Sequence, residues 1–301
     1  MAADDAFRTA VARLGDLSSP AEVAPGRPVR AVDEPAVAAL AASLAPPGPN
    51  RARVKRRLEI AALRAGLAPR RYLRNLGTLG LEGQARLLEA RVGVAGLGGL
   101  GGLVSETLAR AGIGELVLVD PDVATDDNLN RQLLATEETL GRPKVDVAAA
   151  RLAAVNSATT VETHRLRAEE NDFARLFRGT AAVVDCLDSV PARFALFRAA
   201  ASVGAPLVHG AIAGLSGHVT TFFPGDPGPE VLYGPLDPQR DRGIETLVGN
   251  PSATPAMIAA LQAQEVVKVL SGVGQPLRGR LLVLDALSGY AAVFELWPEG
   301  G

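Results

Sequence analysis

The stretch RVGVAGLGGLGG, residues 91–102, decides the fold of this chain. An apolar run suited to one short buried strand ends in five glycines within seven residues. Gly96, Gly98 and Gly101 give the pattern G-x-G-x-x-G, in which the first glycine permits a tight turn, the second lets the backbone approach a phosphate, and the third lets helix and strand pack closely. The stretch therefore predicts a strand, a phosphate-binding turn and a helix whose N-terminus faces the anion.

Strand and helix signals alternate after this turn. Strands are expected at 115–120 (ELVLVD), 181–188 (AAVVDCLD) and 205–210 (APLVHG), with helices over about 137–155 and from Pro191 onward. This alternation predicts an α/β fold with a doubly wound, mostly parallel, Rossmann-like sheet. Beyond residue 215, apolar strands joined by turns predict an antiparallel C-terminal extension.

Four regions follow from these patterns. Residues 1–50, rich in Ala and Pro, are expected to be a helical N-terminal extension with two short helices, ending in a linker at APPGPN. Residues 51–90 are a basic helical segment whose charges are expected mostly to face solvent. Residues 91–224 are the nucleotide-binding core, and residues 225–301 add a crossover loop, a helix and antiparallel strands to the same domain.

Composition narrows the functional classes. The 301 residues carry a net charge of −2 and one cysteine, so an intrachain disulfide and a Cys-based zinc site are excluded, and nucleic acid is an unlikely partner. The acidic start lacks the basic region of a secretory signal, and no apolar run approaches the roughly 20 residues of a membrane span. We expect a cytoplasmic protein that does not contact membranes.

Polar side chains beyond the strand ends indicate which phosphate is bound. Asp120 ends the second strand, where an acid can accept a hydrogen bond from a ribose hydroxyl, as in NAD and ATP enzymes alike. Strand carboxyl ends converge on one crevice, which would also gather amides, two cations and a carboxylate. Hydride transfer needs no such cluster, whereas chemistry at phosphorus needs cations, and a carboxylate to hold a metal. The residues concerned are Asn128, Arg131, Gln132, Lys144 and Asp188.

This constellation resembles the ThiF/MoeB/HesA family, bacterial relatives of ubiquitin-activating enzymes. The resemblance covers residues 70–295 through RRYLRN, GLGGLG, VDPD, NLNRQ, GRPK, DCLDS, GAIAGLSGHV and LLVLDALSG, in that order. The family uses Mg-ATP to adenylate the C-terminal glycine of a small ubiquitin-like protein, usually a sulfur carrier ending in Gly-Gly. The resemblance thus implies an adenylyltransferase that requires ATP and Mg²⁺ and forms a homodimer.

The resemblance also implies a role for each motif residue. The glycine loop would hold the ATP phosphates, Asp120 the ribose, and Asp188 the Mg²⁺. Arg131 and Lys144 would stabilise charge at the α-phosphate, while Asn128 and Gln132 would orient the nucleotide or the incoming carboxylate. Arg74 would reach into the partner's site, as an arginine finger does. The loop residues are Gly96, Gly98, Gly99 and Gly101.

The chain departs from the family at its cysteines. Many members bind zinc through two C-x-x-C pairs, which would fall near 231–234 and the terminal LWPEGG, and both are missing here. No cysteine lies in the crossover loop, and Cys186 is expected to be an inert residue at a buried strand end. We therefore expect no zinc, and adenylation without an enzyme thioester.

Other interpretations remain open at this point. The same chemistry could act on a small-molecule, peptide or tRNA-borne carboxylate, and an NAD-dependent oxidoreductase or a non-catalytic scaffold are further alternatives. Asp185 is expected to make a structural hydrogen bond, and His209 and His218 to line the core or a pocket.

Overall fold

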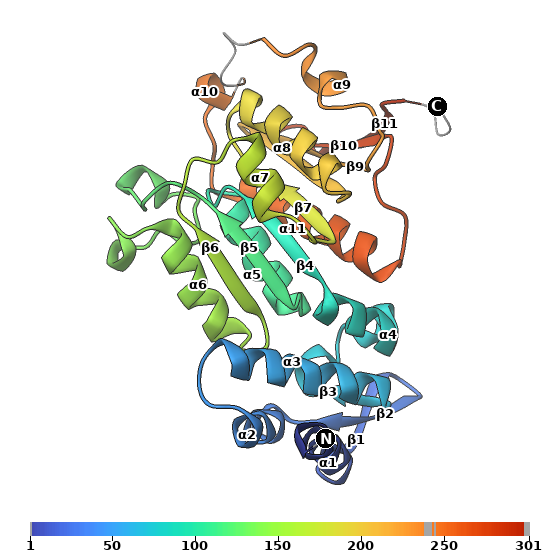
Figure 1. Ribbon diagram of the computed structural model, residues 1–301. Coiled ribbons are helices and arrows are strands. Elements are labelled where there is room, and N and C mark those ends of the chain that lie inside the picture. Colours follow the sequence, from blue (N-terminus) through green and yellow to red (C-terminus); the bar gives the residue numbers. More distant parts are fainter. Residues whose placement is uncertain (1, 238–242, 244, 298–301) are drawn as a thin grey trace.

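Eight strands form one sheet through the middle of the molecule (Figure 1). The computed structural model describes residues 2–237, 243 and 245–297. The strand order is β11-β10-β9-β8-β7-β4-β5-β6, and the five strands from β8 to β6 are parallel. The other three pair antiparallel beside β8, which confirms the predicted α/β class with its antiparallel extension. The strands are β4 (Arg91–Ala95), β5 (Glu115–Val119), β6 (Thr160–His164), β7 (Ala182–Asp185), β8 (Leu207–Ala213), β9 (Ser216–Phe222), β10 (Arg280–Asp285) and β11 (Tyr290–Glu295).

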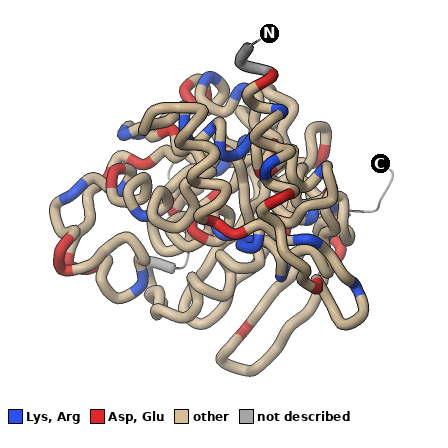
Figure 2. The backbone as a smooth tube through the Cα atoms, turned by 90° about the horizontal axis from the view of Figure 1, so that it is seen from below, with Lys and Arg blue, Asp and Glu red and all other residues tan. Residues whose placement is uncertain are grey.

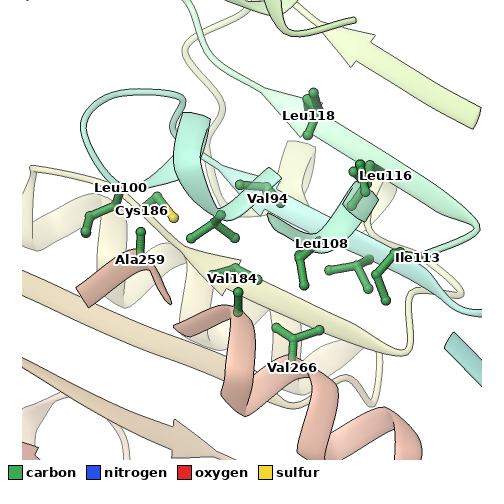
Figure 3. Packing of buried hydrophobic residues seen from close by; sticks show 14 of the residues in the cluster. Val94, Leu100, Leu108, Ile113, Leu116, Leu118, Val184, Cys186, Ala259 and Val266 are labelled. Atoms are coloured by element: carbon green, nitrogen blue, oxygen red, sulfur yellow. The ribbon is translucent and has the colours of Figure 1, made fainter. Parts of the chain in front are cut away.

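Helices cover both faces of the parallel strands because alternate strand residues are apolar in both directions. Val94 and Leu118 belong to the cluster formed with α5 (Gly101–Ala111), α6 (Lys144–Val155) and α11 (Ala253–Ser271), part of which Figure 3 shows. Val117 and Val119 belong to the opposite cluster, formed with α7 (Glu170–Leu176) and α8 (Val190–Ser202). Two short helices, α9 (Glu230–Tyr233) and α10 (Glu245–Val248), lie in the long connection between β9 and α11.

The N-terminal region contains a small sheet that the sequence did not predict. The two helices expected before residue 50 are α1 (Ala2–Asp16) and α2 (Glu34–Leu44), but a hairpin of β1 (Ser19–Ala24) and β2 (Arg27–Val32) lies between them. The basic segment is α3 (Pro49–Arg64), β3 (Leu67–Pro69) parallel to β2, a 3₁₀ turn η1 (Arg70–Tyr72) and α4 (Leu76–Glu89). These elements enclose a hydrophobic cluster of their own, which includes Leu14, Val37 and Leu58.

Most basic residues of this segment are exposed, as expected, but three of them join the N-terminal region to the domain of the large sheet: Lys55, Arg56 and Arg71. Lys55 is 3% exposed, forms an ion pair with Glu34 and donates to Ser157 Oγ at 2.6 Å. Arg56 donates to the carbonyl oxygen of Gly114. Elsewhere, in the view of Figure 2, acidic and basic residues are interspersed, in keeping with the small net charge.

A buried carboxyl lies at the same junction. Glu59 is fully buried, and its Oε2 accepts a hydrogen bond from the hydroxyl of Tyr72 at 3.1 Å. That hydroxyl in turn accepts one from Asn156 Nδ2 at 3.0 Å. Burial raises the pKa of Glu59 to about 7, although Arg71 and Lys55 act in the opposite direction. Ionisation of Glu59 in the folded state therefore lowers the free energy of unfolding.

We expect the free energy of unfolding to depend on pH through Glu59. The folded state binds this proton more tightly than the unfolded state, so the stabilisation is complete below about pH 4.5 and is lost as pH rises through about 7. When the pH is raised from 5.5 to 8, the native chain should lose this stabilisation and Glu59→Gln should not. The free energy of unfolding of the variant minus that of the native chain should therefore increase, by at most about 3 kcal/mol. Urea unfolding at the two pH values measures this, with Glu82→Gln, an exposed partner of Arg86, as control. An equal difference at both pH values would contradict the assignment.

Candidate functional site

The glycine loop lies against the end of β7. Gly96 has a φ of 87°, and its N–H donates to the carbonyl oxygen of Val119 at 2.9 Å. A methyl group at Gly96 would lie 2.6 Å from the carbonyl oxygen of Cys186, and one at Gly101 would lie 1.8 Å from that of Gly96. No side chain fits at either position. The loop consequently runs directly from β4 into α5 and directs the N-terminus of α5 toward the crevice.

Asp120 fixes the shape of this loop. Its Oδ2 accepts a hydrogen bond from the N–H of Leu97 at 2.6 Å, and its Oδ1 accepts one from the N–H of Asp122 at 2.8 Å. The side chain is buried, and burial raises its pKa while the nearby Lys144 acts to lower it. The structure thus assigns Asp120 an anchoring role, and its hydrogen bond to a ribose stays a prediction.

The segment after β5 contributes two buried amide side chains, one of which lies against the loop. A 3₁₀ turn, η2 (Asp126–Asn128), leads to Gln132, whose Nε2 is 3.7 Å from the position of a methyl group on Gly98. Both Asn128 and Gln132 are buried, yet the Oδ1 of one and the Oε1 of the other accept no hydrogen bond within the described part of the chain. An unpaired buried oxygen costs on the order of 1–3 kcal/mol, so these two atoms fit a site whose ligand or water supplies donors.

Two cations border the same crevice. Lys144 is the first residue of α6, is 5% exposed, and donates to Asp122 Oδ2 at 3.3 Å. Arg131 lies beside Gly99, its Cγ 3.7 Å from the position of a methyl group there. Its Nη1 donates to the carbonyl oxygen of Asp127 at 2.7 Å. The same Nη1 donates to Asn130 Oδ1 at 2.8 Å, so the guanidinium is held by its own segment. Both cations are of the kind that binds phosphate oxygens.

The turn after β7 carries the two predicted aspartates into different surroundings. Asp185 is fully buried, and its Oδ2 is 2.7 Å from His209 Nδ1. Asp188, three residues beyond the end of β7, is exposed. Cys186, between them, is buried beside the loop, and burial raises the pKa of its thiol far above the ordinary value.

A magnesium ion fits this turn on the chemistry of its donors. The exposed carboxylate of Asp188 follows a strand end whose carbonyl, at Cys186, touches the phosphate loop. Among the described residues there is no group of three or more His, Cys, Asp or Glu side chains arranged to hold a metal. Mg²⁺ in nucleotide sites commonly uses one or two carboxylates, with phosphates and waters as its other ligands.

Arg74 is not brought to the crevice of its own chain. It lines a groove with Asn75, Thr107 at the C-terminal half of α5, and Gln264 of α11. The glycine loop lies at the other end of α5, a helix of 11 residues and so roughly 16 Å long.

Two residues near the loop were missed by sequence reasoning. The Oδ1 of Asn250 is buried without a partner among the described residues, and its carbonyl oxygen accepts a hydrogen bond from Asn130 Nδ2 at 3.3 Å. Pro255, in the first turn of α11, lies 3.2 Å from the position of a methyl group on Gly99. Both follow a long segment without periodicity, and no local pattern connects them with a loop 150 residues earlier.

Comparison with known proteins decides the family. The ThiF family model matches residues 72–298. The chain belongs to the ThiF family. It is 37% identical over 220 residues to the SAMP-activating enzyme E1 of Haloferax volcanii (72% of this chain, 81% of the relative). It is 39% identical to the sulfur carrier protein adenylyltransferase of Thermus thermophilus (70% and 80%) and 36% identical to the molybdopterin-synthase adenylyltransferase of Salmonella typhimurium (72% and 88%).

This ThiF family chain is therefore an enzyme of the adenylyltransferase class, and membership implies the use of ATP. Among solved structures, E. coli MccB with MccA-N7isoASN aligns with a TM-score of 0.67 at 20% identity, covering 88% of this chain and 84% of MccB. PaaA aligns with a TM-score of 0.65 at 23% identity, covering 76% and 73%. These likenesses concern the fold. The MccB alignment covers more residues than the family model spans, so it includes part of the N-terminal region.

Two glycine substitutions should separate folding from nucleotide binding. Gly101→Ala should lower the free energy of unfolding by several kcal/mol, because its methyl group meets backbone at 1.8 Å. The methyl group of Gly98→Ala would make only ordinary contacts, so the free energy of unfolding should change by less than about 1 kcal/mol. ATP should bind tenfold or more weakly, because the methyl group would lie where the backbone approaches the phosphates most closely. Chemical denaturation and calorimetric titration with ATP measure the two effects. Gly15→Ala, with no atom near its methyl position, is the control for both, and unaltered ATP affinity in Gly98→Ala would refute the loop assignment.

Proposed function

We propose that this enzyme uses ATP and Mg²⁺ to adenylate the C-terminal glycine carboxylate of a ubiquitin-like sulfur-carrier protein. The observation that carries the proposal is the glycine loop, which admits no side chain at Gly96 or Gly101 and lies against Arg131 and Gln132. Among the described residues, Gln132 has a buried oxygen without a partner, and Lys144 lies near Asp120, which anchors the same loop. The relatives named for activating SAMP, a sulfur carrier protein or molybdopterin synthase support the choice of substrate.

The reaction joins two anions, so positioning and charge neutralisation are its main requirements. The carrier's own carboxylate oxygen attacks the α-phosphorus, the bond from this phosphorus to the bridging oxygen breaks, and pyrophosphate leaves. Lys144 and Arg131 would neutralise phosphate charge, and the N-terminal amides of α5 would hold the phosphate oxygens. No nucleophilic side chain of the enzyme is needed for this step.

Asp188 would hold the magnesium ion. Bound there, Mg²⁺ would neutralise charge on the phosphates and on the leaving pyrophosphate. Asn128 and Gln132 would use their unpartnered oxygens toward the nucleotide, directly or through water. We further propose a cytoplasmic enzyme; no helix in the described ranges is both long and apolar enough to cross a bilayer.

The acyl-adenylate would leave the enzyme without passing through a thioester. Cys186 is the chain's one cysteine, and it is buried beneath the glycine loop with a thiol pKa raised by burial. A thiol held in its neutral form is a poor nucleophile. A separate molecule would thus supply the sulfur or accept the acyl group.

We also propose a homodimer in which Arg74 serves the partner's crevice. Support comes from its position in the groove formed with α5 and α11, at the end of α5 away from its own glycine loop. An arginine supplied across an interface would add a third cation to the phosphates.

Pyrophosphate exchange into ATP tests the activity. Exchange should require a carrier ending in Gly-Gly and should disappear when the two glycines are removed from that carrier. A short peptide, a tRNA and small carboxylates are the competing substrates. Exchange with one of these alone, or NAD binding without any exchange, would replace the proposal.

Asp188→Asn should reduce exchange at least about 100-fold, because loss of the carboxylate's charge removes the proposed Mg²⁺ ligand. The circular dichroism spectrum and melting temperature should stay near those of the native enzyme. Asp146→Asn, at an exposed position on α6, is the matched control. Exchange by Asp188→Asn at the native rate would remove Asp188 from the proposed site.

Mixing two inactive variants tests the role of Arg74. If it acts across a dimer, subunits carrying Arg74→Ala and subunits carrying Asp188→Ala should together regain about a quarter of native activity, since half of randomly paired dimers contain one intact site. Each variant alone should be inactive. Activity that stays absent after subunit exchange, verified by native mass spectrometry, would place Arg74 outside the partner's site.

A further inference from the structure

A chain of hydrogen bonds connects α9 with the turn that carries Asp188. The hydroxyl of Tyr233, the last residue of α9, is 2.7 Å from Arg193 Nη1 and 3.0 Å from His209 Nε2. Arg193 belongs to α8 and His209 to β8, and both are buried. One phenol group thus contacts two elements of the core from the connection between β9 and α11.

Both branches of this chain end on the backbone of Leu187, the residue before Asp188. Arg193 Nη2 donates to the carbonyl oxygen of Leu187 at 2.6 Å. Asp185, bonded to His209 through Oδ2, accepts the N–H of Leu187 at its Oδ1, 3.0 Å away. The carbonyl of Leu187 is thus held by Arg193, which contacts the hydroxyl of Tyr233 directly, and its N–H by Asp185, which is connected to that hydroxyl through His209.

One assignment of donors and acceptors satisfies every hydrogen bond from Arg193 to Asp185. Asp185 accepts from its neighbours, so His209 donates through Nδ1 and leaves Nε2 as an acceptor. Tyr233 then donates to that Nε2 and accepts from Arg193. His218 Nε2 lies 3.3 Å from His209 Nε2 on the side of β9, but the one lone pair of that nitrogen is used by Tyr233 in this arrangement. The order is Arg193 to Tyr233 to His209 to Asp185, with no reversal.

We propose that Tyr233 is a positioning residue. Through the hydrogen bonds of its hydroxyl, the position of the 186–188 turn depends on the position of α9. The inference rests on the proposed function, in which Asp188 holds Mg²⁺. A carrier tail that contacts the connection between β9 and α11 would thereby influence how well the enzyme holds its metal–nucleotide substrate. Tyr233 itself touches none of the reacting groups.

Tyr233→Phe removes the hydroxyl and keeps the ring. It should raise the Mg²⁺ concentration that half-saturates pyrophosphate exchange by roughly three- to tenfold, with a smaller change in the maximal rate. Independently of activity, the rise in melting temperature caused by ATP should need correspondingly more Mg²⁺, while that caused by ATP in EDTA stays unchanged. Tyr290→Phe, at a half-exposed tyrosine on β11, should alter neither midpoint.

A double-mutant cycle tests the path. Arg193→Lys keeps the charge but cannot contact Leu187 and Tyr233 in the same way, so its effect on the Mg²⁺ midpoint should be less than additive with that of Tyr233→Phe. Additive effects would mean that the two residues act separately and would overturn the path.

The outcomes separate this inference from the proposed function. A native Mg²⁺ midpoint in Tyr233→Phe, with or without a lower melting temperature, overturns the positioning role. Absence of carrier-dependent exchange in the native enzyme overturns the proposed substrate, and the Mg²⁺ dependence of thermal stabilisation by ATP then still decides whether Tyr233 acts on the turn.

Discussion

The contact between the glycine loop and the end of β7 determines how this molecule is built. Gly96 and Gly101 bring backbone against backbone at a distance that excludes any side chain, and the carbonyl of Cys186 closes the contact from the next strand. Because β4 and β7 are neighbours in a parallel sheet, this contact places the start of α5 and the turn of residues 186–188 on the same edge. The phosphate loop and the proposed metal-holding turn are therefore two sides of one packed junction, and Asp120 secures it with two further hydrogen bonds.

The polar groups at this edge are of two kinds, those that stabilise the fold and those that are available to a ligand. Asp185 and His209 are buried and bonded to each other, whereas Asn128 and Gln132 keep buried oxygens without partners among the described residues. Satisfied groups of the first kind give a rigid frame, and unsatisfied groups of the second kind cost stability until a ligand or water donates to them. Tyr233 belongs to the first kind, although it comes from the long connection before α11. Its position shows that this connection is tied to the frame at α9.

Sequence reasoning reached the sheet, its parallel core and the turn between β4 and α5 because these depend on local signals. Apolar runs of strand length, the glycine spacing and the polar residues after each strand can all be read within short windows. It failed at the hairpin of residues 19–32, whose proline-containing strands SPAEVA and RPVRAV lack regular alternation. It also failed for Lys55 and Arg56, since a cation that pairs across a junction looks, in sequence, like one that faces water. Asn250 and the partnership of His209 with Asp185 depend on contacts between distant segments, which no window contains.

The junction at Asn156 bears on whether the large domain could exist without the N-terminal region. Asn156 donates to Tyr72 and to the carbonyl of Ala109 and accepts from the N–H of Ala158, while Lys55 reaches Ser157. Without residues 2–71, Tyr72 would lose Glu59, and the loops around Gly114 and Asn156 would lose the charged side chains that now meet them. Each region thus supplies hydrogen-bond partners to polar groups of the other. A chain shortened to start at Tyr72 would therefore need compensating substitutions on the surface that the removal exposes.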